Sequence, residues 1–506
     1  MIVAAISNIK ERKGGKRIGI QRFDPQRKHT KVVVLKEDGE IVEEMEGGIL
    51  GNMENHAPRN PRWIITYADD TWTNLHTLID LKNLDGAADF GCPWHMALAN
   101  KFARKPPRFM RGFEALRRFG GIWEAPQHVR QRILNFYAEK FGVPGGKPAA
   151  NKAKISYDEK TLCLNVPLET RIYDLRSLEI EELITMEQLY LELLKRVPRK
   201  ARKAYLGAGY VGLIDPEKPN IVWYYVGWGT LVPRVPVGIF VYDRESGEII
   251  AGPKHPLEII WEEGLDEEYP AANLVRREDL YNPDSRLYDD RALVGHIYGT
   301  YPGEAVFSVT VSLMRLAPRD RGERKRLGLP GGTRWSFPFK LDLDLRVRGY
   351  VSRFWFGDVE AVFAHSEWGS GGRYACLGCG VLAQVSMVFP YDPFNDRLLG
   401  GAVLLSRNFR VLRVFDAIRF EEWFRGEYGF VGRKSYYVGV SWKRAAVSPD
   451  GGRIFVPVVA EDLRSKEEWL YAFISDWSGG RVREVGCWER SRVDRSDIVP
   501  HWSTWV

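Results

Sequence analysis

The feature that most constrains this fold is a recurring strand phrase: an apolar run, a polar turn that usually contains Gly, and a second apolar run. It occurs at residues 31–42, 238–250 and 469–485. In the third copy the turn reads Asp476-Trp477-Ser478-Gly479-Gly480. Apolar runs on both sides of such a turn predict β-hairpins. Because the hairpins are spread from one end of the chain to the other, they predict one radially repeated all-β architecture rather than a series of α/β modules.

Composition fits this prediction. The chain has 506 residues, of which 12% are aromatic and 49 are Gly. Aromatic residues favour pleated strands, and Gly favours the tight turns that join them. Length alone suggests about three domains, but closed all-β folds often exceed the usual domain size. One large domain with insertions is therefore also compatible with this length.

Charge and the pattern of apolar residues limit the cellular locations and the classes of partner that we expect for this protein. A formal net charge of +7 is modest for 506 residues, so it fits a local basic surface and not a protein that wraps nucleic acid. No apolar run approaches about 18 residues, the length that spans a membrane. The first residues lack the basic segment of a signal peptide, and the five cysteines are scattered. We expect a soluble, intracellular (cytoplasmic or virion) protein with no membrane partner.

Arg outnumbers Lys, Gln is scarce, and charged residues make up 27% of the chain. This bias is typical of proteins from hot environments, so we expect a thermophilic source. Composition does not separate a cell from a virus that infects it.

The periodicity of apolar residues divides the chain into β regions and helical insertions. We expect β-structure over residues 1–92, 149–185 and 207–506, and helical insertions over 93–148 and 186–206. Pro106-Pro107 and Gly120-Gly121 divide the first insertion into about three helices. In the second insertion, Leu189, Leu193 and Leu194 share one helical face.

Two segments resemble the opening of a β-propeller blade of the YVTN/WD40-like repeat type. They are Ile155-Ser156-Tyr157-Asp158-Glu159-Lys160-Thr161-Leu162 and Val447-Ser448-Pro449-Asp450-Gly451-Gly452-Arg453-Ile454-Phe455-Val456. Residues 173–179 and 242–248 resemble the outer hairpin of such blades. The copies cover about a third of the chain, and residues 257–400 lack the signature turns.

The resemblance implies an all-β fold, an irregular β-propeller of about seven blades with helical insertions, each blade having about 40–50 residues. A protein of several stacked β-sandwich sheets is the alternative.

Gly207-Ala208-Gly209-Tyr210-Val211-Gly212 matches the GxGxxG pattern of dinucleotide-binding loops. That chemistry needs a helix after the glycines, whose N-terminus receives the pyrophosphate. Asp215-Pro216-Glu217-Lys218-Pro219 follows almost at once and forbids such a helix. We therefore predict a Gly-rich strand here and no cofactor.

Cys376 and Cys379 form a single CxxC pair. A structural zinc site needs two more ligands, and His365 and Cys487 could complete it only if folding brought them to the pair. Packed thiols at a strand turn are the favoured interpretation, so we predict no metal site.

A ribonuclease H-like nuclease is a rival interpretation of the first residues. Asp24, Asp69 and Asp70 would be the carboxylates at strand ends that hold two divalent ions. Residues 47–59 are loop-like, however, where the expected helix would lie. Carboxylates in turns explain these residues equally well.

Basic residues concentrate on the two predicted helical insertions. Arg and Lys neutralise phosphates, and neighbouring aromatic rings such as Phe109 and Trp123 stack on bases. The alternative is a solvated helix face of a heat-adapted protein. The candidate nucleic-acid-binding residues are Lys101, Arg104, Lys105, Arg108, Arg111, Arg117, Arg118, Arg130 and Arg132 in the first insertion, and Lys195, Arg196, Arg199, Lys200, Arg202 and Lys203 in the second.

The leading hypothesis is a noncatalytic scaffold that binds a protein partner or a larger assembly, such as a virion, through aromatic and Arg anchors. Binding of nucleic acid or a ribonucleoprotein by the basic insertions is the second hypothesis. The metal-dependent nuclease is the third. No catalytic residue is predicted.

Overall fold

The computed structural model of this protein describes residues 2–7, 30–38, 40–47, 63–67, 75–80, 88–91, 153–166, 169–206, 208–228, 235–282, 285, 287, 292–330, 334–356, 359–364, 373–377, 380–388, 399–430, 436–440, 445–465, 468–490 and 502–505. The chain forms two compact units. One unit consists of Met1–Asp70, Leu75–Phe90 and Arg353–Val506, and the other of Thr71–Asn74 and Gly91–Ser352.

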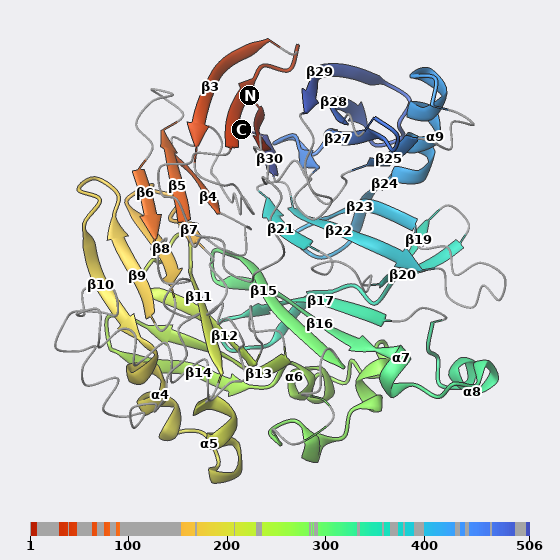
Figure 1. Cartoon of the computed structure of the whole chain (residues 1–506). Coiled ribbons are helices and arrows are strands. Elements are labelled where there is room, and N and C mark those ends of the chain that lie inside the picture. Colours follow the sequence, from red (N-terminus) through yellow and green to blue (C-terminus); the bar gives the residue numbers. More distant parts are fainter. Residues whose placement is uncertain are drawn as a thin grey trace. The chain divides into compact units, whose positions relative to one another are not determined.

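The second unit contains three consecutive four-stranded sheets, in which each strand pairs antiparallel with the next one along the chain (Figure 1). Their strands are β7 (Ala153–Ile155), β8 (Thr161–Val166), β9 (Glu169–Asp174) and β10 (Ile180–Thr185); β11 (Gly209–Ile214), β12 (Ile221–Trp228), β13 (Val235–Asp243) and β14 (Glu248–Lys254); and β15 (Leu293–Tyr301), β16 (Glu304–Ser312), β17 (Arg334–Asp342) and β18 (Val347–Tyr350).

The first strands of these three sheets converge. The hydroxyl of Thr300 in β15 donates to the carbonyl oxygen of Ile214 in β11 over 2.7 Å. The ammonium of Lys154 in β7 donates to the carbonyl oxygen of Thr300 over 3.2 Å. All three residues are buried, whereas the fourth strands β14 and β18 are partly exposed along their length. First strands inside and fourth strands outside are the radial order of propeller blades.

The turns that follow these first strands are also joined. The backbone N–H of Tyr157 donates to the carbonyl oxygen of Pro216 over 2.8 Å. The carboxylate of Asp215, which is fully buried, accepts from the backbone N–H of Gly303. One backbone–backbone bond and one bond to a buried carboxylate thereby link three successive turns, and the buried Asp215 carboxylate has the partner that a buried polar group needs.

Short helices lie between or beside these sheets. They are α4 (Met186–Leu194), α5 (Arg199–Leu206), α6 (Pro256–Glu262), α7 (Leu313–Leu316), α8 (Arg321–Arg326) and the 3-10 turns Pro270–Leu274 and Arg277–Asp279.

The first unit is also built from antiparallel sheets. The strand orders are β3-β2-β1-β30, β4-β5-β6, β19-β20-β22-β23-β24 with β21 beside β22, and β25-β27-β28-β29 with β26 beside β27. The bounds are β1 (Ile2–Ser7), β2 (Thr30–Leu35), β3 (Ile41–Gly47), β4 (Trp63–Tyr67), β5 (Leu75–Asp80), β6 (Ala88–Gly91), β19 (Arg353–Phe356), β20 (Val359–Ala364), β21 (Arg373–Leu377), β22 (Gly380–Val388), β23 (Leu399–Leu405), β24 (Val411–Asp416), α9 (Ala417–Glu427), β25 (Tyr436–Val440), β26 (Ala446–Val447), β27 (Arg453–Asp462), β28 (Glu468–Asp476), β29 (Val482–Arg490) and β30 (Trp502–Trp505).

Two contacts join the ends of the chain within this unit. β1 pairs antiparallel with β30, so that Ile2 lies opposite Trp505. The guanidinium of Arg453 makes a two-pronged contact with the Glu37 carboxylate, at 2.5 and 2.8 Å. This ion pair ties the β2–β3 turn to the start of β27. Phe420 and Phe424 of α9 are buried in a core that includes residues of β23 and β24 and residues of β26, β27 and β28.

The two signature turns of the sequence have the same hydrogen bonds. The Ser156 hydroxyl donates to Asp158 over 2.6 Å and accepts from the N–H of Thr161. The Ser448 hydroxyl donates to Asp450 over 2.5 Å and accepts from the N–H of Arg453. The prediction of a mainly β chain made of small antiparallel sheets is confirmed. A closed ring, the number of blades and the insertion boundaries stay predictions.

The structure gives no support to the nuclease interpretation. Asp24, Asp69 and Asp70 lie outside the described residues. β1 pairs with β2 and β30, and β4 pairs with β5 in a different sheet. β11 (Gly209–Ile214) includes the last four residues of the GxGxxG segment, so these four residues form a strand and not a cofactor loop.

Candidate docking surface on helices α4 and α5

Helix α4 begins at a capping box. The backbone N–H of Gln188 donates to the Thr185 hydroxyl over 3.2 Å, and the N–H of Thr185 donates to the Gln188 side chain over 2.8 Å. Two N–H groups that would otherwise lack partners are satisfied in this way. The helix then buries Leu189 and Leu193 in an apolar core shared with neighbouring strands, including β13 and β14.

The turn between the helices is closed by Arg202. Its guanidinium donates to the carbonyl oxygens of Leu194, over 3.0 Å, and Val197, over 3.3 Å. Carbonyl groups at a helix C-terminus lack helical partners, and a cationic side chain is well suited to satisfy them. Arg202 therefore holds α5 against the end of α4.

Helix α5 is fixed on the sheet by its apolar face. Ala201, Ala204 and Tyr205 are buried. The Tyr205 hydroxyl donates to the carbonyl oxygen of Val237 in β13 over 3.2 Å, and the Tyr210 hydroxyl donates to the carbonyl oxygen of Tyr205 over 3.0 Å. The helix therefore has a defined position, and its opposite face is free to carry charge.

The end of α4, the turn after it and the first turn of α5 carry exposed cations. We use the name α4–α5 surface for Lys195, Arg196, Arg199 and Lys200, all of which are exposed. Lys195 pairs with Glu192 over 2.6 Å. Arg196, Arg199 and Lys200 make no ion pair or side-chain hydrogen bond within the part of the chain that the structure describes. Residues 193–214 hold six cationic residues and no Asp or Glu, and Glu192, directly before this segment, pairs only with Lys195 among the four cations of this surface.

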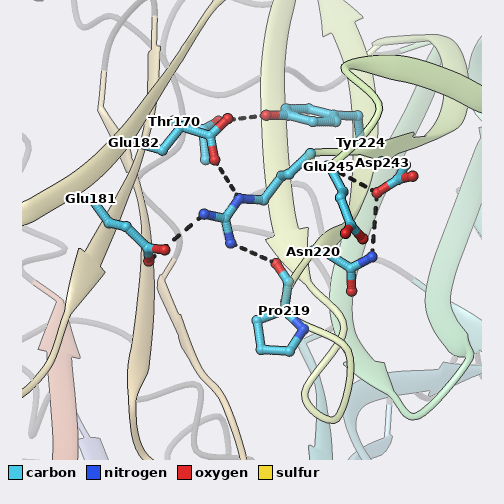
Figure 2. A network of polar contacts seen from close by, with 9 residues as sticks. Thr170, Glu181, Glu182, Pro219, Asn220, Tyr224, Asp243 and Glu245 are labelled. Carbon is cyan, nitrogen blue, oxygen red and sulfur yellow. Dashed lines mark hydrogen bonds and ion pairs between the residues drawn. The ribbon is translucent and has the colours of Figure 1, made fainter.

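A polar network joins the two sheets on which α4 rests (Figure 2). The Arg244 side chain is only 11% exposed. It donates to Glu182 over 2.6 Å and to the carbonyl oxygen of Pro219 over 3.0 Å, and it lies 3.7 Å from Glu181. Glu181 and Glu182 belong to β10, and Arg244 follows β13 directly. One guanidinium thus links the outer strand of one sheet to the outer hairpin of the next.

The same two sheets are joined deeper inside. The Tyr224 hydroxyl lies 3.0 Å from the Thr170 hydroxyl, which donates to Asn165 over 3.0 Å. The Asn165 side chain accepts from the N–H of Gly212 over 2.8 Å. Burial raises the pKa of Tyr224 well above its ordinary value, so its hydroxyl keeps its proton and can donate. Because α4 contacts both β10 and β14, these bonds fix the base of the α4–α5 surface.

The structure brings part of the predicted site together. Lys195, Arg196, Arg199 and Lys200 share one helical corner, and Arg202 faces the end of α4. Lys203 lies in α5, but its side chain is outside the described residues. The nine candidate residues from Lys101 to Arg132 also lie outside them. The structural role of Arg202 was missed, since a cation beside a helix end carries no sequence signal that separates capping from binding.

The second cysteine of the predicted CxxC pair lies outside the described residues, and the first lies inside them. Cys376 lies in β21, and Cys379 is outside the described residues. Across the described ranges, no group of three or more His, Cys, Asp or Glu side chains is arranged to hold a metal ion. No helix in those ranges is both long and apolar enough to cross a bilayer.

No protein-family model and no curated protein matches the chain. Among solved structures, it is similar to the β-propeller domain of Cps50 (Swd1) from Myceliophteria thermophila, with 7% identity and a TM-score of 0.35 over 88% of this chain and 98% of that one. It is similar to apo AztD from Citrobacter koseri, with 7% identity and a TM-score of 0.33 over 94% of each chain. For the WD40 domain of SCAP from fission yeast the values are 11% and 0.24, over 69% of this chain and 74% of that one. All three TM-scores are below 0.5, so the description of the fold rests on the strand order of the sheets and not on these similarities.

Proposed function

We propose that this protein is a noncatalytic β-propeller scaffold that binds a macromolecular partner, and that the α4–α5 surface is a place where the partner docks. The propeller part is supported by the convergence of first strands at Thr300 and by the four-stranded order of consecutive sheets. We take the antiparallel sheets of both units as its blades, about seven in all. A component of a virion or of another large assembly is one form that such a scaffold takes.

The docking part rests on one observation: exposed cations without an ion-pair partner among the described residues lie on helices whose position is fixed by hydrogen bonds and packing. Arg196, Arg199 and Lys200 have no partner within the described residues, while α5 beneath them is held by Tyr205 and Arg202. Because the backbone beneath these cations is fixed, binding of a partner costs little further backbone freedom. Charged side chains at an exposed surface also steer the encounter and select partners of opposite charge.

Affinity capture from the native source tests this function. The tagged full-length protein is compared with R196E/R199E/K200E, with recovered proteins and nucleic acids identified by mass spectrometry and sequencing. We expect a defined partner to be retained by the wild-type protein and lost by the variant, with weaker capture as salt rises. Recovery of the same partners by both proteins would contradict the docking role.

Nucleic-acid binding is the second candidate function. It is favoured by the six cations and the absence of Asp and Glu over residues 193–214. If this function is correct, binding of RNA or DNA must fall steeply between low and moderate salt, because phosphate neutralisation releases counterions. Affinity that is unchanged by salt would rule it out.

A further inference from the structure

The direction of helix α5 is unfavourable for the charges that it carries. A helix N-terminus is the positive end of the helix dipole and is stabilised by acidic residues. α5 instead begins with Arg199 and Lys200 and has no acidic residue in its first turn. Stability of the helix therefore does not explain why these two cations are there.

Helix α8 of the same unit follows the opposite order. Its N-cap is Asp320, whose carboxylate accepts from the N–H of Glu323 over 2.7 Å. Its last turn holds Arg324, Lys325 and Arg326. Acidic residues at the start and basic residues at the end are the arrangement that the dipole favours. α5 thus departs from an order that another helix in this chain obeys.

We propose that the α4–α5 surface binds a polypeptide segment rich in Asp and Glu. The inference rests on the proposed function and names the chemistry of the partner. The cations and the start of α5 favour negative charge at the same place, and Glu192 is the one carboxylate that pairs with these cations among the described residues. Arg guanidinium groups match carboxylates with two parallel hydrogen bonds, which gives Arg196 and Arg199 a specific partner geometry.

Surrounding residues favour a polypeptide over nucleic acid. Single-stranded nucleic acid is bound by stacking its bases on exposed rings. In α4 and α5, Tyr205 is buried and Tyr190 packs partly buried on the core, so neither offers an open platform. β10 and β14, against which α4 packs, carry exposed Glu181 and Glu248. Carboxylates on the strands that support α4 are unfavourable for a long phosphate backbone.

Exposed apolar side chains on the same two strands suit a protein partner. Ile180 in β10 is 37% exposed, and Ile250 in β14 is 46% exposed. Protein interfaces combine apolar contacts with charged groups at their edge.

Fluorescence anisotropy with full-length protein tests the inference. The probes are a labelled Glu/Asp peptide, a Gln/Asn peptide of equal length, an oligo(U) RNA and a DNA duplex, each at low and moderate salt. We expect the acidic peptide to bind and R199E/K200E to weaken it by about tenfold or more. The neutral variant R199Q/K200Q gives a second measurement if charge reversal disturbs folding. K325E/R326E on α8 removes equal charge from the same unit and is expected to leave peptide affinity unchanged.

Three results would overturn the inference. If RNA or DNA binds, loses affinity in R199E/K200E, and the acidic peptide does not bind, the surface is a docking site but its partner is a nucleic acid. If K325E/R326E weakens the peptide as much as R199E/K200E, the attraction comes from net charge and not from this surface. If the wild-type protein and R199E/K200E bind every probe equally, the acidic-segment inference fails, and the capture experiment with R196E/R199E/K200E decides the docking role separately.

Discussion

The hydroxyl of Tyr205 occupies the space that a side chain at residue 238 would need. A Cβ atom on Gly238 would lie 2.1 Å from Tyr205 Oη, which is closer than atoms in van der Waals contact allow. Gly238 therefore lets α5 lie directly against β13, where the same hydroxyl reaches Val237.

Gly238→Ala is expected to destabilise the second unit by about 1–3 kcal/mol, because overpacking forces a buried side chain or the helix to move. Urea unfolding measures the loss. Since the closest atom is the hydroxyl oxygen, adding Tyr205→Phe is expected to restore part of the stability. Equal stability of wild type and Gly238→Ala would show that α5 is not held as described.

The Arg244 network predicts a second stability effect. Arg244→Met removes a guanidinium that bonds Glu182 and the Pro219 carbonyl. Hydrogen bonds to charged groups contribute about 1.5–3 kcal/mol, so a loss of that order is expected in urea unfolding. Arg244→Lys keeps the charge but lacks the forked geometry, and it is expected to recover only part of the loss. Full stability of Arg244→Met would contradict a linking role.

His255 predicts a pH dependence. Burial lowers the pKa of His255 to about 3. Its Nδ1 accepts from the N–H of Leu257 and its Nε2 lies 3.0 Å from the Pro236 carbonyl oxygen, so the neutral ring is the form that fits. In the unfolded chain the pKa is about 6.5. Stability is therefore complete above about pH 6.5 and is lost as pH falls from there towards 3.

The urea midpoint of His255→Asn, measured across that pH range, is expected to change less with pH than that of the wild type. The substitution also costs some stability at neutral pH, because the ring caps α6 at Leu257 and bonds the Pro236 carbonyl oxygen of β13. Parallel curves for the two proteins would exclude His255 as a source of the pH dependence.

Turn carboxylates predict a second loss at lower pH. The Ser448 hydroxyl and the N–H of Gly452 hold the pKa of Asp450 below its ordinary value. The folded state thus favours the ionised form. Its contribution is present above the unfolded pKa of about 3.9 and is lost as pH falls through the folded value. The difference in urea midpoint between wild type and Asp450→Asn should be largest near neutral pH and should shrink below about pH 4. A constant difference would contradict this.

Local features of the fold were predictable from sequence. The turns at Ser156 and Ser448 are set by side chains that bond backbone groups within five residues, so their residue types carry the signal. Apolar runs around Asp243 and Asp476 predicted the β13–β14 and β28–β29 hairpins for the same reason.

Long-range features were not predictable. Arg244 and Glu182 are 62 residues apart, and β1 and β30 lie at opposite ends of the sequence. Neither pairing has a local signature, because many other Arg–Glu pairs and strand pairs fit one sequence equally well. The sequence showed that cations cluster at residues 195–203. Only the structure shows that the Arg202 side chain closes the turn between the helices, whereas the Arg199 side chain is exposed.

The central claim is that Arg199 and Lys200 serve a partner and not the stability of α5. The most direct test is the thermal midpoint of R199E/K200E compared with that of K325E/R326E. Because acidic residues favour a helix N-terminus, R199E/K200E is expected to raise the midpoint by about 1–4 °C, whereas K325E/R326E, at a helix C-terminus, is expected to lower it. A fall of the midpoint in R199E/K200E equal to that in K325E/R326E would contradict the claim.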